Sequence, residues 1–193
     1  MAERARAYGA SVVLVEQGRI GGNALNTGAV PAKALAAAGA HARALRDGPP
    51  FGIAAEDPKV NFRRVHDHID QVIAALAPQS SAAHLMALGI DVIEGAARFI
   101  SRKAVAVGDT EIRARHFVVA TGARWVAPTI PGLDAVPYFT PDTILDNTRT
   151  LPHLVVIGSG VPAIELAQAY NRLGTEVTVV AGGELLPGFD PEL

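Results

Sequence analysis

The chain has 193 residues, a formal net charge of −2 at pH 7, 49% hydrophobic residues and no cysteine. This length suffices for one large domain or two small ones, each with its own core. No uncharged run reaches the roughly 18 residues that span a bilayer, and the two signs of charge are interspersed. We therefore expect a cytoplasmic protein without a membrane or nucleic-acid partner. Without cysteine, the chain has no disulfide, thiolate metal ligand or thiol nucleophile.

Helical and strand patterns alternate along the chain, which favours an α/β fold with a largely parallel sheet. Helices are predicted over residues 1–8, from Pro31 to about Arg46, over residues 62–88 with an interruption at Pro78 and a restart at Ser80 and Ser81, and over residues 163–173. Strands are predicted over residues 11–16, 91–93, 98–100, 104–107, 110–113, 117–120, 154–157 and 176–180. The strand over residues 117–120 is expected to be buried and parallel.

A glycine motif lies in the second half of the chain, where VVIGSGVPA over residues 155–163 joins a strand to a helix. In a dinucleotide-binding βαβ unit, Gly158 permits the tight turn and Gly160 lets a pyrophosphate approach the backbone. Ala163 permits close packing of helix on strand, and the helix N-terminus offers N–H groups to phosphate. The alternative is a glycine turn that only packs. No acidic side chain follows the second strand, so the sequence does not distinguish NADH from NADPH.

A second pattern lies near the start of the chain, where the strand VVLVE ends at Glu16 and GGNALNTGAVPAK follows over residues 21–33. A carboxylate at the end of such a strand holds the ribose in dinucleotide folds. Taken alone, Glu16 could equally be a surface glutamate. Its meaning depends on the motifs that accompany it.

Four further motifs follow in the chain: GAARF, VVATGARWVAPTIPGL, TLPHLVVIGSGVPAIELAQAYNRLGTEVTVV and LLPGFDPEL. Together with the two patterns above, they resemble the flavin-dependent pyridine nucleotide disulfide oxidoreductases in order and spacing along essentially the whole chain. Within that family the chain is similar to mercuric reductase and to dihydrolipoamide dehydrogenase. The resemblance implies doubly wound, Rossmann-like domains for FAD and NAD(P)H. It places a partial FAD-binding domain at residues 1–150 and the first βαβ unit of the NAD(P)H-binding domain at residues 151–193.

The resemblance also implies a set of cofactor-binding residues. Glu16 would bind the adenosine ribose of FAD, and Lys33 would bring positive charge beside the flavin ring, unless it is simply an exposed helix lysine. Backbone contacts with FAD would come from Gly21, Gly22, Ala97, Thr121 and Gly122, and the NAD(P)H side would comprise Gly158, Gly160 and Glu165. Val161 replaces the tyrosine that shields the flavin in the family.

The main departure from the family is at Ala24 and Ala29, which occupy the positions of the two redox cysteines. Alanine accepts no electrons and binds no soft metal ion, so this loop excludes disulfide exchange and thiolate-dependent mercury reduction. We therefore predict no catalytic residue of that kind. Hydride transfer to flavin is not excluded, because that chemistry belongs to the cofactor.

A second departure concerns the first strand of the FAD domain with its phosphate-binding loop, and the C-terminal dimerising domain, which have no counterpart in the sequence. The first strand lies in the middle of a doubly wound sheet. Its absence leaves unpaired edges, so we expect the chain alone to hold FAD poorly or not at all and to be inactive. Two functions stay open: an FAD-dependent NAD(P)H oxidoreductase that passes electrons to a small-molecule acceptor such as oxygen or a quinone, and a non-catalytic fragment without bound cofactor.

The six histidines do not predict a metal site. His66 and His68 are two residues apart on a predicted helix and therefore do not share a face. No histidine is paired with carboxylates at the spacing of metal ligands.

Overall fold

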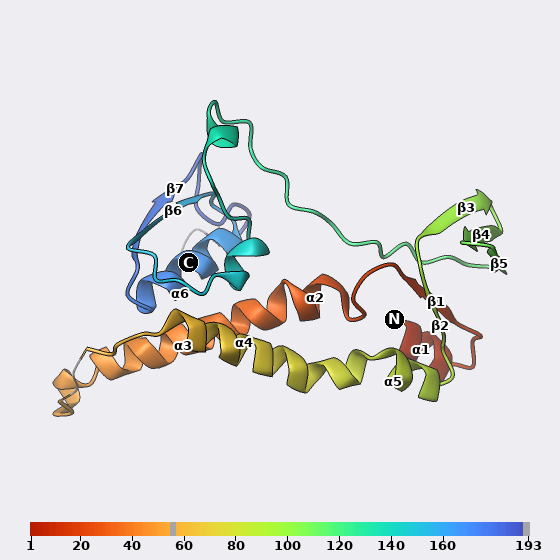
Figure 1. Cartoon of the computed structure of the whole chain (residues 1–193), viewed down its shortest axis with the longest axis horizontal. Helices are drawn as coiled ribbons and strands as arrows, with labels where there is room; N and C mark the ends of the chain where they lie inside the picture. The colour runs from red at the N-terminus through yellow and green to blue at the C-terminus, as the bar shows by residue number, and fades with distance from the viewer. Residues whose placement is uncertain (55–56, 191–193) are drawn as a thin grey trace. The chain divides into compact units, whose positions relative to one another are not determined.

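The computed structural model describes residues 1–54 and 57–190 (Figure 1). The chain forms two compact units, each made of two stretches of sequence. Unit 1 comprises Met1–Asn26 and Ala74–Arg124, and unit 2 comprises Thr27–Ile73 and the chain from Trp125 onward. These units differ from the two cofactor-binding domains that the sequence predicts, and the boundary of those domains at residue 150 stays a prediction.

Unit 1 begins with the helix α1 (Ala2–Ala7), which ends where Gly9 adopts a φ of +83°. The chain then enters β1 (Val13–Glu16), which pairs in parallel with β2 (Asp91–Glu94). A parallel pair needs a long connection, and the second stretch of unit 1 returns through α5 (Ala82–Ala87) before β2. The Ser81 hydroxyl caps α5 by accepting a hydrogen bond from the His84 amide at 3.1 Å. The predicted helix restart is thus confirmed.

The second sheet of unit 1 is antiparallel, in the order β3 (Ala97–Ser101), β4 (Ala104–Val107), β5 (Thr110–Arg113) (Figure 1). Two-residue connections, Arg102–Lys103 and Gly108–Asp109, join its strands. The central strand β4 supplies most of the buried side chains, including Ala104, Val105 and Val107. The predicted strands are confirmed here, and the sheet that they form is antiparallel.

The prediction of a buried parallel strand over residues 117–120 is wrong. These residues join no ladder among the described strands, and Val118 and Val119 are 67% and 71% exposed. Their apolar pattern is typical of a strand, but a strand forms only when a neighbour pairs with its N–H and C=O groups. No described strand lies in register with this segment.

Unit 2 contains a parallel pair, β6 (His153–Ile157) and β7 (Glu176–Val180), joined by α6 (Val161–Arg172). The helix α3 (Ala29–Arg46) packs against α6, and α4 (Phe62–Leu76) lies beside α3 (Figure 1). The observed α3 begins two residues before the predicted start at Pro31, and α6 begins two residues before Ala163.

The core of unit 2 is formed by apolar residues of these three helices and of the 3-10 helix η4 (Thr143–Asp146). Its buried members are Ala34, Leu35, Ala42, Phe62, Ile69, Ile144, Leu145, Leu166, Ala169, Tyr170 and Leu173. Small residues let α3 and α6 approach closely. A Cβ on Gly39 would lie 3.1 Å from the Ala169 carbonyl oxygen and 3.3 Å from the Arg172 Cβ. This packing fixes the position of α6, which begins at the glycine motif.

The remaining elements are short. They are α2 (Gly22–Asn26) and the 3-10 helices η1 (Pro49–Phe51), η2 (Ala77–Ser80) and η3 (Leu133–Ala135). The sequence did not predict α2, which is a single turn between two glycine-rich stretches. The predicted interruption at Pro78 is confirmed, because α4 ends at Leu76 and η2 follows.

Candidate functional site

The loop after β1 has a backbone that only glycine adopts easily. Gly21 and Gly22 have φ values of +96° and +59°. A Cβ on Gly21 would lie 2.5 Å from Cδ2 of Leu25, a buried residue one turn into α2. Asn26 donates from its side chain to the Gly22 carbonyl at 2.8 Å, which fixes the other end of the turn. Gly21 therefore has a local structural role in addition to its predicted place beside the flavin.

Ala24 and Ala29 lie on separate helical elements. Ala24 is in the middle of α2 and Ala29 is the first residue of α3, and both are exposed. A methyl group at either position has no polar or redox chemistry to offer a ligand. The absence of a cysteine pair at these two positions follows from the sequence alone.

Glu16 is half-buried at the carboxyl end of β1, where its carboxylate accepts a hydrogen bond from the Gly18 amide at 2.9 Å. Its carbonyl accepts from the Gly95 amide at 2.8 Å, so β1 and the entry to β3 lie side by side. Gly95 has a φ of +147°, and a Cβ there would lie 2.7 Å from Cγ1 of Val107. Gly95 thus brings Ala97, the first residue of β3, near the end of β1. A carboxylate held at a strand end in this way fits the hydroxyls of a ribose.

Thr121 and Gly122 belong to the same unit as Glu16 and follow the unpaired 117–120 segment. Both are exposed, and Gly122 has a φ of +78°. Neither is in regular secondary structure. Their predicted contact with FAD stays a prediction.

Lys33 and Glu165 form an ion pair between α3 and α6 within unit 2. The Lys33 side chain is 70% exposed, whereas that of Glu165 is 23% exposed. The more buried carboxylate therefore anchors the more exposed ammonium. Sequence reasoning assigned Lys33 to the flavin side and Glu165 to the NAD(P)H side, and it missed the contact between them. No pattern signals a pair separated by 132 residues.

The glycine motif forms the turn between β6 and α6 that its sequence predicts. Gly158 has a φ of +145°, and a Cβ there would lie 3.4 Å from the Ala163 Cβ. Gly160, by contrast, has a φ of −79°, and a Cβ there would be 3.8 Å from the Pro162 Cδ, an ordinary contact. The chain itself therefore requires glycine at position 158 but not at position 160.

The amides of this turn differ in their availability. The Gly158 amide donates to the Val180 carbonyl at 3.0 Å, which ties the turn to β7. In the part of the chain that the structure describes, no backbone carbonyl accepts from the Ser159 or Gly160 amides. N–H groups at the start of a helix bind phosphate. This turn fits a pyrophosphate, and the absence of a side chain at Gly160 leaves room for one.

The described residues contain no group of three or more His, Asp or Glu side chains placed to hold a metal ion. The His66 imidazole lies 3.4 Å from Asp70 of the same helix and forms a local ion pair when it is protonated. None of the described helices is long and apolar enough to cross a membrane.

A family model for pyridine nucleotide-disulphide oxidoreductases matches residues 1–193, which is the whole chain. The chain belongs to this family. Enzymes of the family are FAD-dependent oxidoreductases that use NAD(P)H. The mixed α/β fold, with its parallel and antiparallel sheets, is that of a flavoprotein disulfide reductase.

Relatives in this family are similar over nearly all of this chain but extend well beyond it. Mercuric reductase of Lysinibacillus sphaericus is 34% identical over 187 residues, which cover 96% of this chain and 34% of the relative. Dihydrolipoyl dehydrogenase of Pseudomonas aeruginosa is 35% identical over 200 residues, which cover 98% of this chain and 42% of the relative. The chain thus spans about a third to two fifths of the curated relatives.

Solved structures of a flavoprotein disulfide reductase show the same fold. The Cu(II) complex of the HOCl-induced enzyme RclA from Escherichia coli matches with a TM-score of 0.80 and 26% identity, covering 99% of this chain and 41% of that chain. A second structure of RclA from Escherichia coli matches with a TM-score of 0.76 and 26% identity, covering 92% of this chain and 38% of that chain. The predicted family and fold are therefore confirmed.

Proposed function

We propose that this chain contributes the FAD and NAD(P)H contacts of an oxidoreductase that passes hydride from NAD(P)H to flavin and then electrons to a small-molecule acceptor. The Lys33–Glu165 ion pair carries this proposal, because it joins the helix that follows the predicted flavin-side loop to the helix that begins at the glycine motif. Bound flavin would supply the redox chemistry by accepting a hydride and releasing electrons.

The chain's own residues would bind and orient the two cofactors. In unit 1, the Glu16 carboxylate would hold the ribose hydroxyls of FAD, with Gly21, Gly22, Ala97, Thr121 and Gly122 offering backbone contacts. In unit 2, the Ser159 and Gly160 amides would bind the pyrophosphate of NAD(P)H. Glu165 would keep the Lys33 ammonium in place, and this fixed positive charge would favour the charge that develops on reduction.

The electron acceptor would differ from those of the named relatives. Mercuric reductases and the disulfide reductase RclA carry names that refer to a soft metal ion or a disulfide. A chain without cysteine offers no thiolate to either. We propose oxygen or a quinone, because either can take electrons from a reduced flavin without a protein thiol.

A second candidate function is that of a non-catalytic member that keeps the family's outline without a cofactor. The exposed and unpaired 117–120 segment favours it, because this segment lies directly before Thr121 and Gly122. Residues that must hold a ligand within about 0.5 Å are best supported by a rigid element, which this segment does not provide.

The test is an absorption spectrum of the purified 193-residue chain mixed with FAD and then freed of unbound FAD. Retained flavin that bleaches anaerobically with NADH or NADPH, and recovers when oxygen is admitted, would support the oxidoreductase function, even if weak binding leaves only a small fraction of the chains loaded with FAD. Lys33→Met should slow the bleaching by about 10- to 100-fold, whereas Lys59→Met, which alters a lysine outside the site, should leave it unchanged. A colourless protein, or one whose flavin does not respond to either nucleotide, would favour the non-catalytic function.

A further inference from the structure

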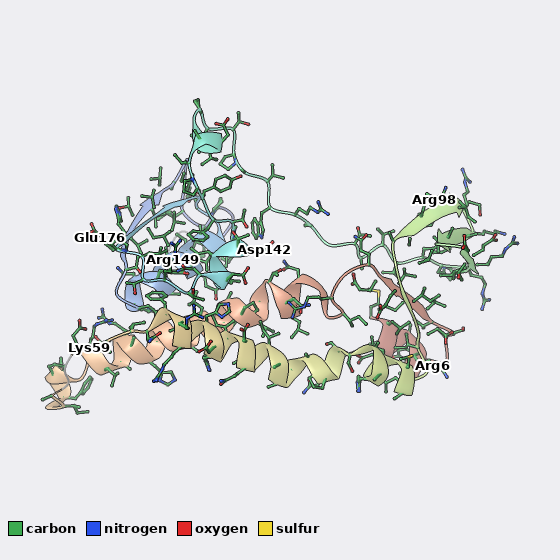
Figure 2. All side chains as sticks on the ribbon, in the orientation of Figure 1. Arg6, Lys59, Arg98, Asp142, Arg149 and Glu176 are labelled. Atoms are coloured by element: carbon green, nitrogen blue, oxygen red, sulfur yellow. The ribbon has the colours of Figure 1, made fainter. Side chains whose placement is uncertain are left out.

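The antiparallel sheet of unit 1 carries a concentration of positive charge that the cofactor proposal does not use. Residues 97–116 contain five basic side chains and two acidic ones, although the whole chain has a net charge of −2. The basic residues are Arg98, Arg102, Lys103, Arg113 and Arg115, and the acidic residues are Asp109 and Glu111. Figure 2 labels Arg98 on β3 among them. Like charges gathered on one small sheet create a positive potential at its surface, which attracts anions.

Three of these cations line an open hollow of about 370 Å³ at one end of the sheet. Arg102 and Lys103 form the connection between β3 and β4, and Arg113 ends β5. Ala104, the first residue of β4, pairs with Ser101 on one side and with Arg113 on the other. The strand pairing therefore brings the three basic residues to the same edge.

Two hydrogen bonds hold the backbone of the β3–β4 connection, which fixes the Cα position of Lys103. The Lys103 amide donates to the Ser101 hydroxyl at 3.2 Å, and the Lys103 carbonyl accepts from the Ala114 amide at 3.1 Å. Arg113 has one acidic partner, Glu111, whose Oε1 lies 2.7 Å from its Nε. Among the described residues, no acidic side chain forms an ion pair with Arg102 or Lys103. The hollow is thus positively charged overall.

We propose that this hollow binds the phosphate group of a small phosphorylated compound. Two guanidinium groups and one ammonium group match the oxygens of a phosphate, because guanidinium binds oxyanions through two parallel N–H donors. The hollow exceeds a phosphate group in volume and is open, so it also admits the organic part of a phosphate monoester. It lies at the far end of β3 from Ala97, about 13 Å along the strand, and is thus separate from the predicted FAD contact.

The test uses the whole chain, labelled with ¹⁵N, and titration with inorganic phosphate at constant ionic strength. We expect saturable shifts of the amide signals of residues 101–104 and 113–114. Arg102→Gln/Lys103→Gln should weaken binding by about tenfold, because two of three cations are lost. Arg63→Gln/Arg64→Gln removes two adjacent exposed arginines of α4 and should leave binding unchanged.

A gain-of-binding variant keeps the proposal testable if the double variant fails to fold. Glu111→Gln removes the acidic partner of Arg113 and should tighten phosphate binding about two- to threefold. Shifts that do not saturate, or that respond equally to the hollow and control variants, would overturn the proposal. Binding to vesicles of an anionic lipid without any response to inorganic phosphate would also overturn it, in favour of a membrane surface. The test needs no FAD, so its failure is distinguishable from failure of the proposed oxidoreductase function.

Discussion

Replacing Tyr170 by phenylalanine tests how α6 is held in the core of unit 2. Tyr170 is 1% exposed, and its hydroxyl donates to the Ile144 carbonyl at 3.0 Å. Its ring stacks on that of Phe62, with 5.7 Å between centroids, and phenylalanine would keep this contact. The variant therefore isolates the hydroxyl, which joins α6 to η4 across 26 residues of sequence.

The expected loss of stability depends on whether the Ile144 carbonyl still accepts a hydrogen bond in the variant. A buried carbonyl left without any donor costs about 1–3 kcal/mol. Here the Asn147 amide also donates to the same carbonyl, at 3.2 Å, and is unaffected by the substitution. We therefore expect a loss near the value for one net hydrogen bond, about 1 kcal/mol in the free energy of unfolding.

The assay is urea unfolding followed by fluorescence of Trp125, the single tryptophan, which lies in unit 2. A loss of about 1 kcal/mol moves the midpoint by about 0.5 M at a slope of roughly 2 kcal/mol per molar urea. Tyr138→Phe is the matched control, because Tyr138 is half-exposed and its substitution should cost less than about 0.5 kcal/mol. Equal midpoints for the two variants would refute the reasoning. A loss above about 3 kcal/mol would refute it as well, since Asn147 would then not satisfy the carbonyl.

Three further predictions concern α6 and its flanks. Gly160→Ala should leave the urea midpoint unchanged but weaken NAD(P)H binding in a fluorescence titration. Gly158→Ala should lower the free energy of unfolding by about 1–3 kcal/mol, because alanine disfavours the positive φ at this position. Equal losses of stability in the two variants would contradict this prediction. Thr175→Val should be neutral or stabilising in the same urea assay, because the buried Thr175 hydroxyl has no partner among the described residues; a loss above about 1 kcal/mol would count against it. Burial raises the pKa of Tyr170 above its usual 10.0, against a smaller lowering effect of the Asn147 side chain. The folded state therefore favours the neutral phenol, and stability should fall as the pH rises above about 10. The difference in midpoint between the unmodified chain and Tyr170→Phe should then shrink, and a constant difference up to about pH 11 would oppose this account.

Local signals predicted the elements whose stability comes from adjacent residues. Periodicity over residues 62–76 predicts α4, Pro78 predicts its end, and Ser81 predicts the cap of α5. The glycine motif predicts the turn into α6, because the backbone at Gly158 disfavours other residues. Each of these features depends on a few consecutive side chains, so the sequence suffices to find them.

Contacts between segments that are distant in the sequence were harder to predict from the sequence. Residues 117–120 have the composition of a buried strand, yet no described strand pairs with them and two of their side chains are exposed. The same limit applies to the contact of Lys33 with Glu165 and to the hollow lined by Arg102, Lys103 and Arg113. These groups are far apart in the chain or are brought together by strand register, which composition does not encode.

The family, the absence of a redox cysteine pair and the positions of the two glycine-rich turns can all be read from the amino-acid sequence, because motif residues and covalent chemistry are properties of single positions. Only the folded chain shows that the backbone requires glycine at position 158 and that Glu165 pairs with Lys33. It also shows that basic side chains line the hollow at the end of the antiparallel sheet. These properties depend on distances across packed helices and paired strands, and such distances are fixed when the chain buries its apolar faces.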